Sequence, residues 1–109
     1  MVQKTDEDSN KPVSFEEVRR VLRGQLPELQ ERYGVISLGI FGSYVRAEQR
    51  YTSDLDLLVE FDERPITLLQ FIELENYLGD LLGVKVDLVE KDTLKPAIGR
   101  HVLQEVVPI

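Results

Sequence analysis

Two aspartates separated by one residue are the part of this chain whose spacing most directly suggests chemistry. Asp54 and Asp56 belong to the run Asp-Leu-Asp-Leu-Leu-Val-Glu-Phe at residues 54–61, whose apolar residues predict a strand. Side chains at positions i and i+2 of a strand leave the same face, so the two carboxylates would lie close together. Because such like charges repel in a partly dry site, the pair predicts a divalent cation, and oxygen ligands favour Mg²⁺ or Mn²⁺.

A glycine–serine pair upstream predicts a phosphate-binding turn. Gly42 and Ser43 follow an apolar run, and residues 44–53 separate them from Asp54. Glycine lets another group approach the backbone, the amide groups that follow can bind an anion, and the serine hydroxyl adds a donor. A phosphate-binding turn followed by a strand with paired carboxylates indicates metal-assisted phosphoryl or nucleotidyl transfer.

A third carboxylate is available on a later strand. Asp87 lies in the middle of the run Val-Lys-Val-Asp-Leu-Val at residues 84–89, a costly place for a carboxylate unless it is paired, solvated or metal-bound. If this strand neighbours the strand of Asp54 and Asp56, Asp87 would join them. It could then bind a second metal ion or help to activate an attacking hydroxyl group. The alternative is an ordinary solvated strand residue.

The spacing of apolar residues predicts the elements that must position these side chains. It predicts helices over residues 15–33, 68–82 and 94–105, a helical turn over 43–47, and strands over 35–41, 54–61 and 84–90. Pro27 predicts a kink in the first helix or its division into two short helices. Residues 106–109 fit either a short strand or a loose end. The predicted fold class is α/β (α+β), with a small mixed sheet of three to four strands and helices packed mainly on one face.

Composition excludes several classes of protein. The chain has 109 residues, with 13 Lys plus Arg against 20 Asp plus Glu, and a formal net charge of −7. The absence of Cys excludes a disulfide scaffold, a Cys-based zinc site and a thiol nucleophile. The acidic balance disfavours direct nucleic-acid binding through bulk charge. Residues 1–12 are polar and without periodicity, which predicts a disordered tail before a single domain at 13–109.

The hydropathy pattern predicts a cytoplasmic protein without a membrane segment. The longest nearly apolar run, residues 35–42, is far shorter than the roughly 20 residues that span a bilayer. The first residues also lack the apolar region of a signal peptide.

With these motifs in place, the chain resembles a known family. Residues 42–47 (Gly-Ser-Tyr-Val-Arg-Ala) and 53–59 (Ser-Asp-Leu-Asp-Leu-Leu-Val) are similar to the minimal nucleotidyltransferase (MNT) family of the DNA polymerase β superfamily. The family pattern joins a Gly-Ser turn, a spacer, an Asp-hydrophobic-Asp strand and a later acidic residue, which corresponds here to Asp87. The resemblance covers residues 14–105. Ala47 departs from it, because many relatives carry Gly there.

The resemblance implies a site and a reaction. The β and γ phosphates of ATP or another nucleoside triphosphate would lie on the phosphate-binding turn, and Arg46, with Arg50 as a second candidate, would neutralise them. A hydroxyl group would attack the α-phosphorus and release pyrophosphate. Two Mg²⁺ ions, with Mn²⁺ as a possible substitute, would be bound by Asp54, Asp56 and Asp87.

The resemblance also implies a partner. Members of the MNT family pair with a helical HEPN protein, a ribonuclease toxin, and act as its antitoxin by transferring AMP to one of its Tyr residues. Two alternatives stay open at the level of the sequence. One is a non-catalytic binding module that neutralises its partner by complex formation. The other is an enzyme with a small-molecule acceptor such as an aminoglycoside, for which a homo-oligomer could build the pocket.

Overall fold

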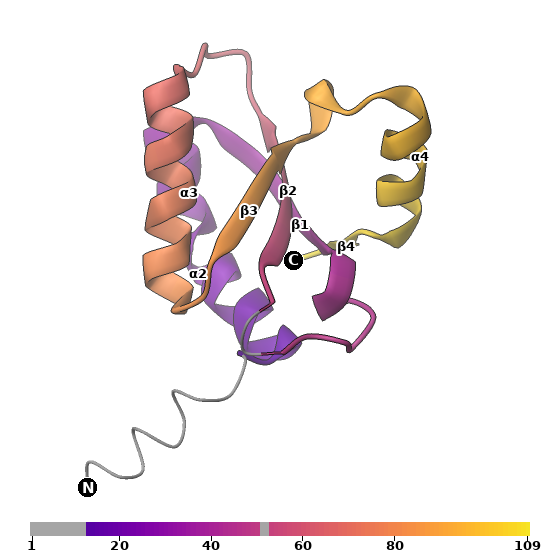
Figure 1. Ribbon diagram of the computed structural model, residues 1–109. Helices are drawn as coiled ribbons and strands as arrows, with labels where there is room; N and C mark the ends of the chain where they lie inside the picture. The colour runs from indigo at the N-terminus through magenta and orange to yellow at the C-terminus, as the bar shows by residue number, and fades with distance from the viewer. Residues whose placement is uncertain (1–12, 51–52) are drawn as a thin grey trace, which may run out of the picture.

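The computed structural model describes residues 13–50 and 53–109 (Figure 1). The predicted disordered tail at 1–12 lies outside the described residues, so it and the domain boundary at residue 13 stay predictions. None of the helices in this described part is long and apolar enough to cross a membrane. The elements are α2 (Phe15–Tyr33), β1 (Val35–Phe41), η1 (Gly42–Tyr44), β2 (Leu55–Phe61), α3 (Leu68–Leu82), β3 (Val86–Glu90), η2 (Lys91–Thr93), α4 (Pro96–Glu105) and β4 (Val107–Pro108).

The strands form one mixed sheet in the order β3-β2-β1-β4. β1 runs antiparallel to both β2 and β4, whereas β2 and β3 are parallel. Parallel neighbours need a crossover connection, and α3 provides it between β2 and β3. The predicted mixed sheet of three to four strands is therefore confirmed. Of the two alternatives for residues 106–109, a short strand or a loose end, the structure shows the short strand, β4.

The apolar core lies between the sheet and the pair of helices α2 and α3, which lie together on one face, while α4 lies apart from them (Figure 1). On β2, Leu55, Leu57 and Val59 are fully buried in this core. Because side chains alternate along a strand, Asp56 points to the opposite face of the sheet. The period-two pattern of β2 thus separates the core residues from the acidic ones.

The first helix is continuous, which makes the predicted division into two short helices wrong. Pro27 lies inside α2 at an exposed position, while Leu22 and Leu29 on either side of it are buried. Burial of these neighbours favours one helix through the proline despite the lost backbone hydrogen bond. The helix ends at Gly34, whose φ of 77° is the left-handed conformation expected of a terminating glycine.

Four elements differ in their bounds from the sequence prediction, and the smallest difference is at β2, which begins at Leu55 and not at Asp54. β3 begins at Val86 and α4 at Pro96, each two residues later than predicted. The predicted turn at 43–47 is a short 3₁₀ helix, Gly42–Tyr44, followed by turn residues that end with Ala47 at a φ of 59°. η2 occupies residues 91–93, between the predicted strand and the predicted helix, and Pro96 then begins α4 at a position where its missing amide group loses no hydrogen bond.

Candidate functional site

The three aspartates singled out in the sequence lie on or next to two neighbouring parallel strands. Asp56 on β2 and Asp87 on β3 are partners in register, and Asp54 directly precedes β2. Asp56 is half-buried, whereas Asp54 and Asp87 are exposed. We call these three residues the carboxylate cluster. It lies on the face of the sheet that α2 and α3 leave open.

The pKa of Asp56 is raised by its position within the carboxylate cluster. Its pKa is raised to about 6, first by burial and then by the negative charges of Asp87 and Asp54, while the positive charge of Arg46 acts in the opposite direction. Burial and like charges both disfavour the ionised form of a carboxylate. The positive charge of Arg46 only partly offsets these effects on an ionised Asp56, and a bound cation would supply further compensation.

The donor chemistry of the carboxylate cluster fits a hard divalent cation. Carboxylate oxygens are the ligands that Mg²⁺ and Mn²⁺ prefer, and the negative charges of Asp87 and Asp54 beside Asp56 would attract a cation. Within residues 13–50 and 53–109, no three His, Cys, Asp or Glu side chains converge closely enough to hold a metal ion as they stand.

Gly42 brings the turn that the sequence predicts to bind phosphate, here called the phosphate-binding turn, directly against Asp56 of the carboxylate cluster. Phe41, the last residue of β1, pairs with Asp56 in the sheet, and Gly42 follows with a φ of 81°. A Cβ at Gly42 would collide with Oδ2 of Asp56. Only glycine combines this left-handed conformation with so close an approach to the carboxylate. Ser43 is half-buried and comes next in η1, so the structure places the Gly-Ser turn beside Asp56.

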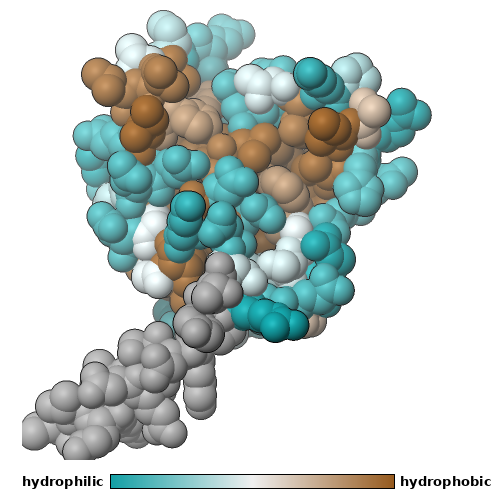
Figure 2. All heavy atoms as spheres, viewed as in Figure 1, coloured by the Kyte–Doolittle hydropathy of each residue, from teal (hydrophilic) through white to brown (hydrophobic). Residues whose placement is uncertain are grey.

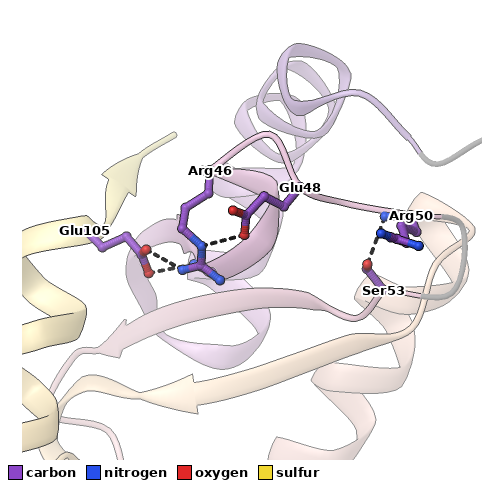
Figure 3. Close-up of polar contacts among 6 residues, drawn as sticks. Arg46, Glu48, Arg50, Ser53 and Glu105 are labelled. Carbon is purple, nitrogen blue, oxygen red and sulfur yellow. Dashed lines mark hydrogen bonds and ion pairs between the residues drawn. The ribbon is translucent and has the colours of Figure 1, made fainter.

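Glu105 is a member of the site that the sequence did not reveal (Figure 3). Its Oε1 accepts a hydrogen bond from the Gly42 amide at 3.0 Å, and its Oε2 accepts one from Nη1 of Arg46 at 2.5 Å. The Gly42 amide first, and then Arg46, hold the pKa of Glu105 below its usual range. Glu105 ends α4, far along the chain from Gly42, and no local motif indicates the contact.

The two arginine candidates differ in their surroundings (Figure 3). Arg46 is paired with two carboxylates, since its Nε also donates to Oε1 of Glu48 at 2.9 Å. These bonds, to Glu48 first and then to Glu105, raise the pKa of Arg46. Arg50 lies apart from this group, and its amide donates to Oγ of Ser53 at 2.8 Å. Arg46 is thus the arginine that the structure ties to the phosphate-binding turn.

Comparison with known proteins gives consistent matches. Residues 22–108 match the family model described as "Nucleotidyltransferase domain". A relative from Thermococcus cleftensis, named protein adenylyltransferase MntA, is 53% identical over 95 residues, which cover 87% of this chain and 95% of the relative. A solved structure named as a candidate minimal nucleotidyltransferase has 40% identity and a TM-score of 0.74, and the match covers 89% of this chain and 97% of that one.

A more distant solved structure shares the fold. It is a complex of the tri-AMPylated HEPN toxin of Shewanella oneidensis with an MNT antitoxin, at 18% identity and a TM-score of 0.59. The match covers 83% of this chain and 70% of that one.

Proposed function

Since this chain belongs to the nucleotidyltransferase family and is an enzyme of that family, we propose that it transfers AMP from ATP to a hydroxyl group of a partner protein. The observation that carries the proposal is the meeting of two features in one place: the paired carboxylates of Asp56 and Asp87, and the backbone of Gly42 against Asp56. Family membership gives the reaction class, and these contacts give the residues that would perform it.

The carboxylate cluster would bind two Mg²⁺ ions, with Mn²⁺ as a substitute. Ions held there supply Lewis-acid stabilisation of the phosphate oxygens. Asp56 would be the central ligand because it lies between Asp54, which directly precedes its strand, and Asp87 on the neighbouring strand. Cation binding would favour the ionised form of Asp56 and remove the repulsion within the cluster.

The remaining site residues would bind and orient the nucleotide. The phosphate-binding turn, through the Ser43 hydroxyl and backbone, would bind the β and γ phosphates, and Arg46 would neutralise part of their charge. The acceptor oxygen would form a bond to the α-phosphorus while the bond from that phosphorus to the β-bridging oxygen breaks. Pyrophosphate leaves with the electron pair of that bond, and Asp87 would accept the proton of the acceptor hydroxyl.

A protein acceptor is supported by the relatives and by the openness of the site. Asp54 and Asp87 are exposed, so a side chain on a folded partner could reach them. The relative from Thermococcus cleftensis is named a protein adenylyltransferase, and the Shewanella oneidensis complex holds an AMPylated HEPN toxin. We therefore propose a Tyr of a HEPN-type protein as the acceptor and an antitoxin role for this chain.

An apolar surface also favours a protein partner. Leu68 and Leu69 at the beginning of α3 are 74% and 79% exposed, and apolar side chains gather at that end of the helix (Figure 2). Neighbouring exposed apolar residues of this kind mark surfaces that bind other proteins.

The proposal is tested with ATP labelled on either the α or the γ phosphate, Mg²⁺ and the protein encoded by the adjacent gene. Nucleotidyl transfer places the α label, and not the γ label, on the partner. The double variant Asp54→Asn with Asp56→Asn should transfer no label, whereas Asp80→Asn, an exposed carboxylate on α3, should transfer it as the wild type does. Neutralisation of an unlabelled partner by the double variant would instead favour a non-catalytic binding module.

A further inference from the structure

We propose that Glu105 is a positioning residue that fixes the phosphate-binding turn and Arg46 in the geometry needed to bind the nucleotide. The inference rests on the proposed function and deepens it by adding a residue from α4 to the site. Both oxygens of the Glu105 carboxylate are used, one by the Gly42 amide at 3.0 Å and one by Arg46. A single side chain therefore connects two groups assigned to phosphate binding.

The Gly42 amide needs an internal partner. Gly42 is buried, and a buried amide without a hydrogen bond would cost stability. Glu105 supplies the acceptor, and its side chain is only 17% exposed, so the bond is partly shielded from water. Ser43, which follows Gly42, is more exposed and is thus the residue of the turn that a dissolved nucleotide reaches.

Glu105 is itself held in place by the strand that follows it. β4, Val107–Pro108, pairs with Gly39 and Ile40 of β1, just before the phosphate-binding turn. The Ile109 amide also donates to the Leu38 carbonyl at 3.2 Å. The end of α4 is thus fixed to the strand that leads into the turn, which makes Glu105 a suitable anchor.

The consequences of the contact extend to the carboxylate cluster. Gly42 lies against the Asp56 carboxylate so closely that a Cβ would overlap it. A turn released by loss of Glu105 would therefore also free Asp56 and the guanidinium of Arg46. The opposite role, in which Glu105 competes with the triphosphate for the same donors, predicts the opposite sign for nucleotide affinity.

Two variants separate the roles of acceptor and charge. Glu105→Gln keeps an acceptor for the Gly42 amide and loses the charge that pairs with Arg46, whereas Glu105→Met keeps the length of the side chain and loses both. Glu28→Gln on α2, which breaks an exposed ion pair with Arg32, is the matched control. The amide proton of Gly42, followed by NMR, reports the contact directly. We expect it downfield in the wild type, shifted upfield in Glu105→Met and intermediate in Glu105→Gln.

The functional measurements are the Kd of a non-hydrolysable ATP analogue with Mg²⁺, and KM and kcat for transfer. Loss of a charge-assisted hydrogen bond should raise Kd and KM by about 10-fold in Glu105→Gln, and loss of both bonds should raise them further in Glu105→Met. The kcat should change less than KM, and Glu28→Gln should match the wild type in every measurement.

Three results would overturn the inference: an unchanged Gly42 amide resonance in Glu105→Met, a wild-type Kd in that folded variant, or a tighter Kd in either variant. The last would show competition with the triphosphate. The titration with the analogue needs no acceptor protein, so it tests Glu105 separately from transfer. A wild type that binds the analogue but transfers nothing would refute the proposed transfer. The Kd values of the Glu105 variants would still decide the role of Glu105.

Discussion

Asp56 and Asp87 are register partners on the parallel strands β2 and β3, on the face of the sheet that α2 and α3 leave open. The pairing arises from topology, because α3 carries the chain back so that β3 runs parallel to β2. Two carboxylates placed side by side in this way destabilise the fold unless a cation or a proton is present. The same relationship therefore makes predictions about stability, pH and metal binding.

Replacement of Asp56 by Asn should stabilise the protein in metal-free buffer while abolishing transfer. The pKa of Asp56 is raised from 3.8 to about 6 by burial and by Asp87 and Asp54, so its ionisation opposes folding. Since solvent screens part of this cost at a half-buried position, we expect a gain of about 1 kcal/mol, or a few degrees in Tm, near neutral pH. Thermal melting in the presence of a chelator measures it.

The pH dependence of this gain has a defined sign. A carboxyl group with a raised pKa stabilises the folded state below its unfolded pKa, and this contribution is lost as the pH rises through the folded pKa. The Tm difference between Asp56→Asn and the wild type should therefore be small near pH 4 and reach its full value above about pH 6. Asp62→Asn should have the opposite effect, because hydrogen bonds from Arg64 lower the pKa of Asp62. A gain for Asp56→Asn that is largest at low pH would contradict this electrostatic account.

Gly42→Ala should damage both stability and activity. The new methyl group would overlap the Asp56 carboxylate and would force Ala into a φ of 81°. We expect a loss of about 1–3 kcal/mol in the free energy of unfolding, measured by urea denaturation, together with loss of transfer. Gly24→Ala is the matched control, since it lies in α2 at an exposed position with open space around it. That change should stabilise by about 0.5–1 kcal/mol.

Arg46→Ala should weaken nucleotide binding more than it affects stability. Its side chain is about half exposed and forms ion pairs with Glu48 and Glu105, so the pairs themselves contribute little to folding. Loss of its charge near the triphosphate should raise KM for ATP by about 10-fold or more. The same substitution at Arg50 should have a smaller effect, because Arg50 lies apart from the Arg46 group. An equal effect of the two substitutions on KM would contradict the assignment of Arg46.

Divalent cations should bind to the protein through the carboxylate cluster before any acceptor is present. Added Mg²⁺ should raise the Tm of the wild type, because a ligand that binds only the folded state stabilises it. The shift should be absent in Asp56→Asn and reduced in Asp87→Asn, and a chelator should reverse it and stop transfer. A wild-type shift in Asp56→Asn would show that the cation binds elsewhere.

The sequence was informative where local periodicity controls the structure. The predicted strand over residues 54–61 is present as β2, whose alternation places Leu55 and Leu57 in the core and Asp56 on the other face. The predicted helix over residues 68–82 matches α3, which begins with a capping box formed by Thr67 and Gln70, and both hydrogen bonds of that box lie within four residues. These features depend on interactions between near neighbours in the chain.

Long-range contacts account for what the sequence left open or missed. Whether Asp87 lies beside Asp56 depends on the order of the strands in the sheet, which the sequence does not predict. The sequence analysis could therefore say only that the two would meet if their strands were neighbours. The contact between Glu105 and Gly42 joins residues of two distant elements, and nothing in the residues around either one indicates it. Pro27 shows the converse, because tertiary packing of α2 prevailed over a local helix-breaking preference.

The most direct test of the central claim is the mass of the partner protein after incubation with this chain, ATP and Mg²⁺. The account predicts a partner heavier by one or more adenylates, with the modification on a Tyr, and loss of its toxic activity. The Asp54→Asn, Asp56→Asn double variant should leave the mass and the toxicity unchanged. A partner that loses its toxicity in the presence of wild-type chain while its mass stays the same would contradict the account.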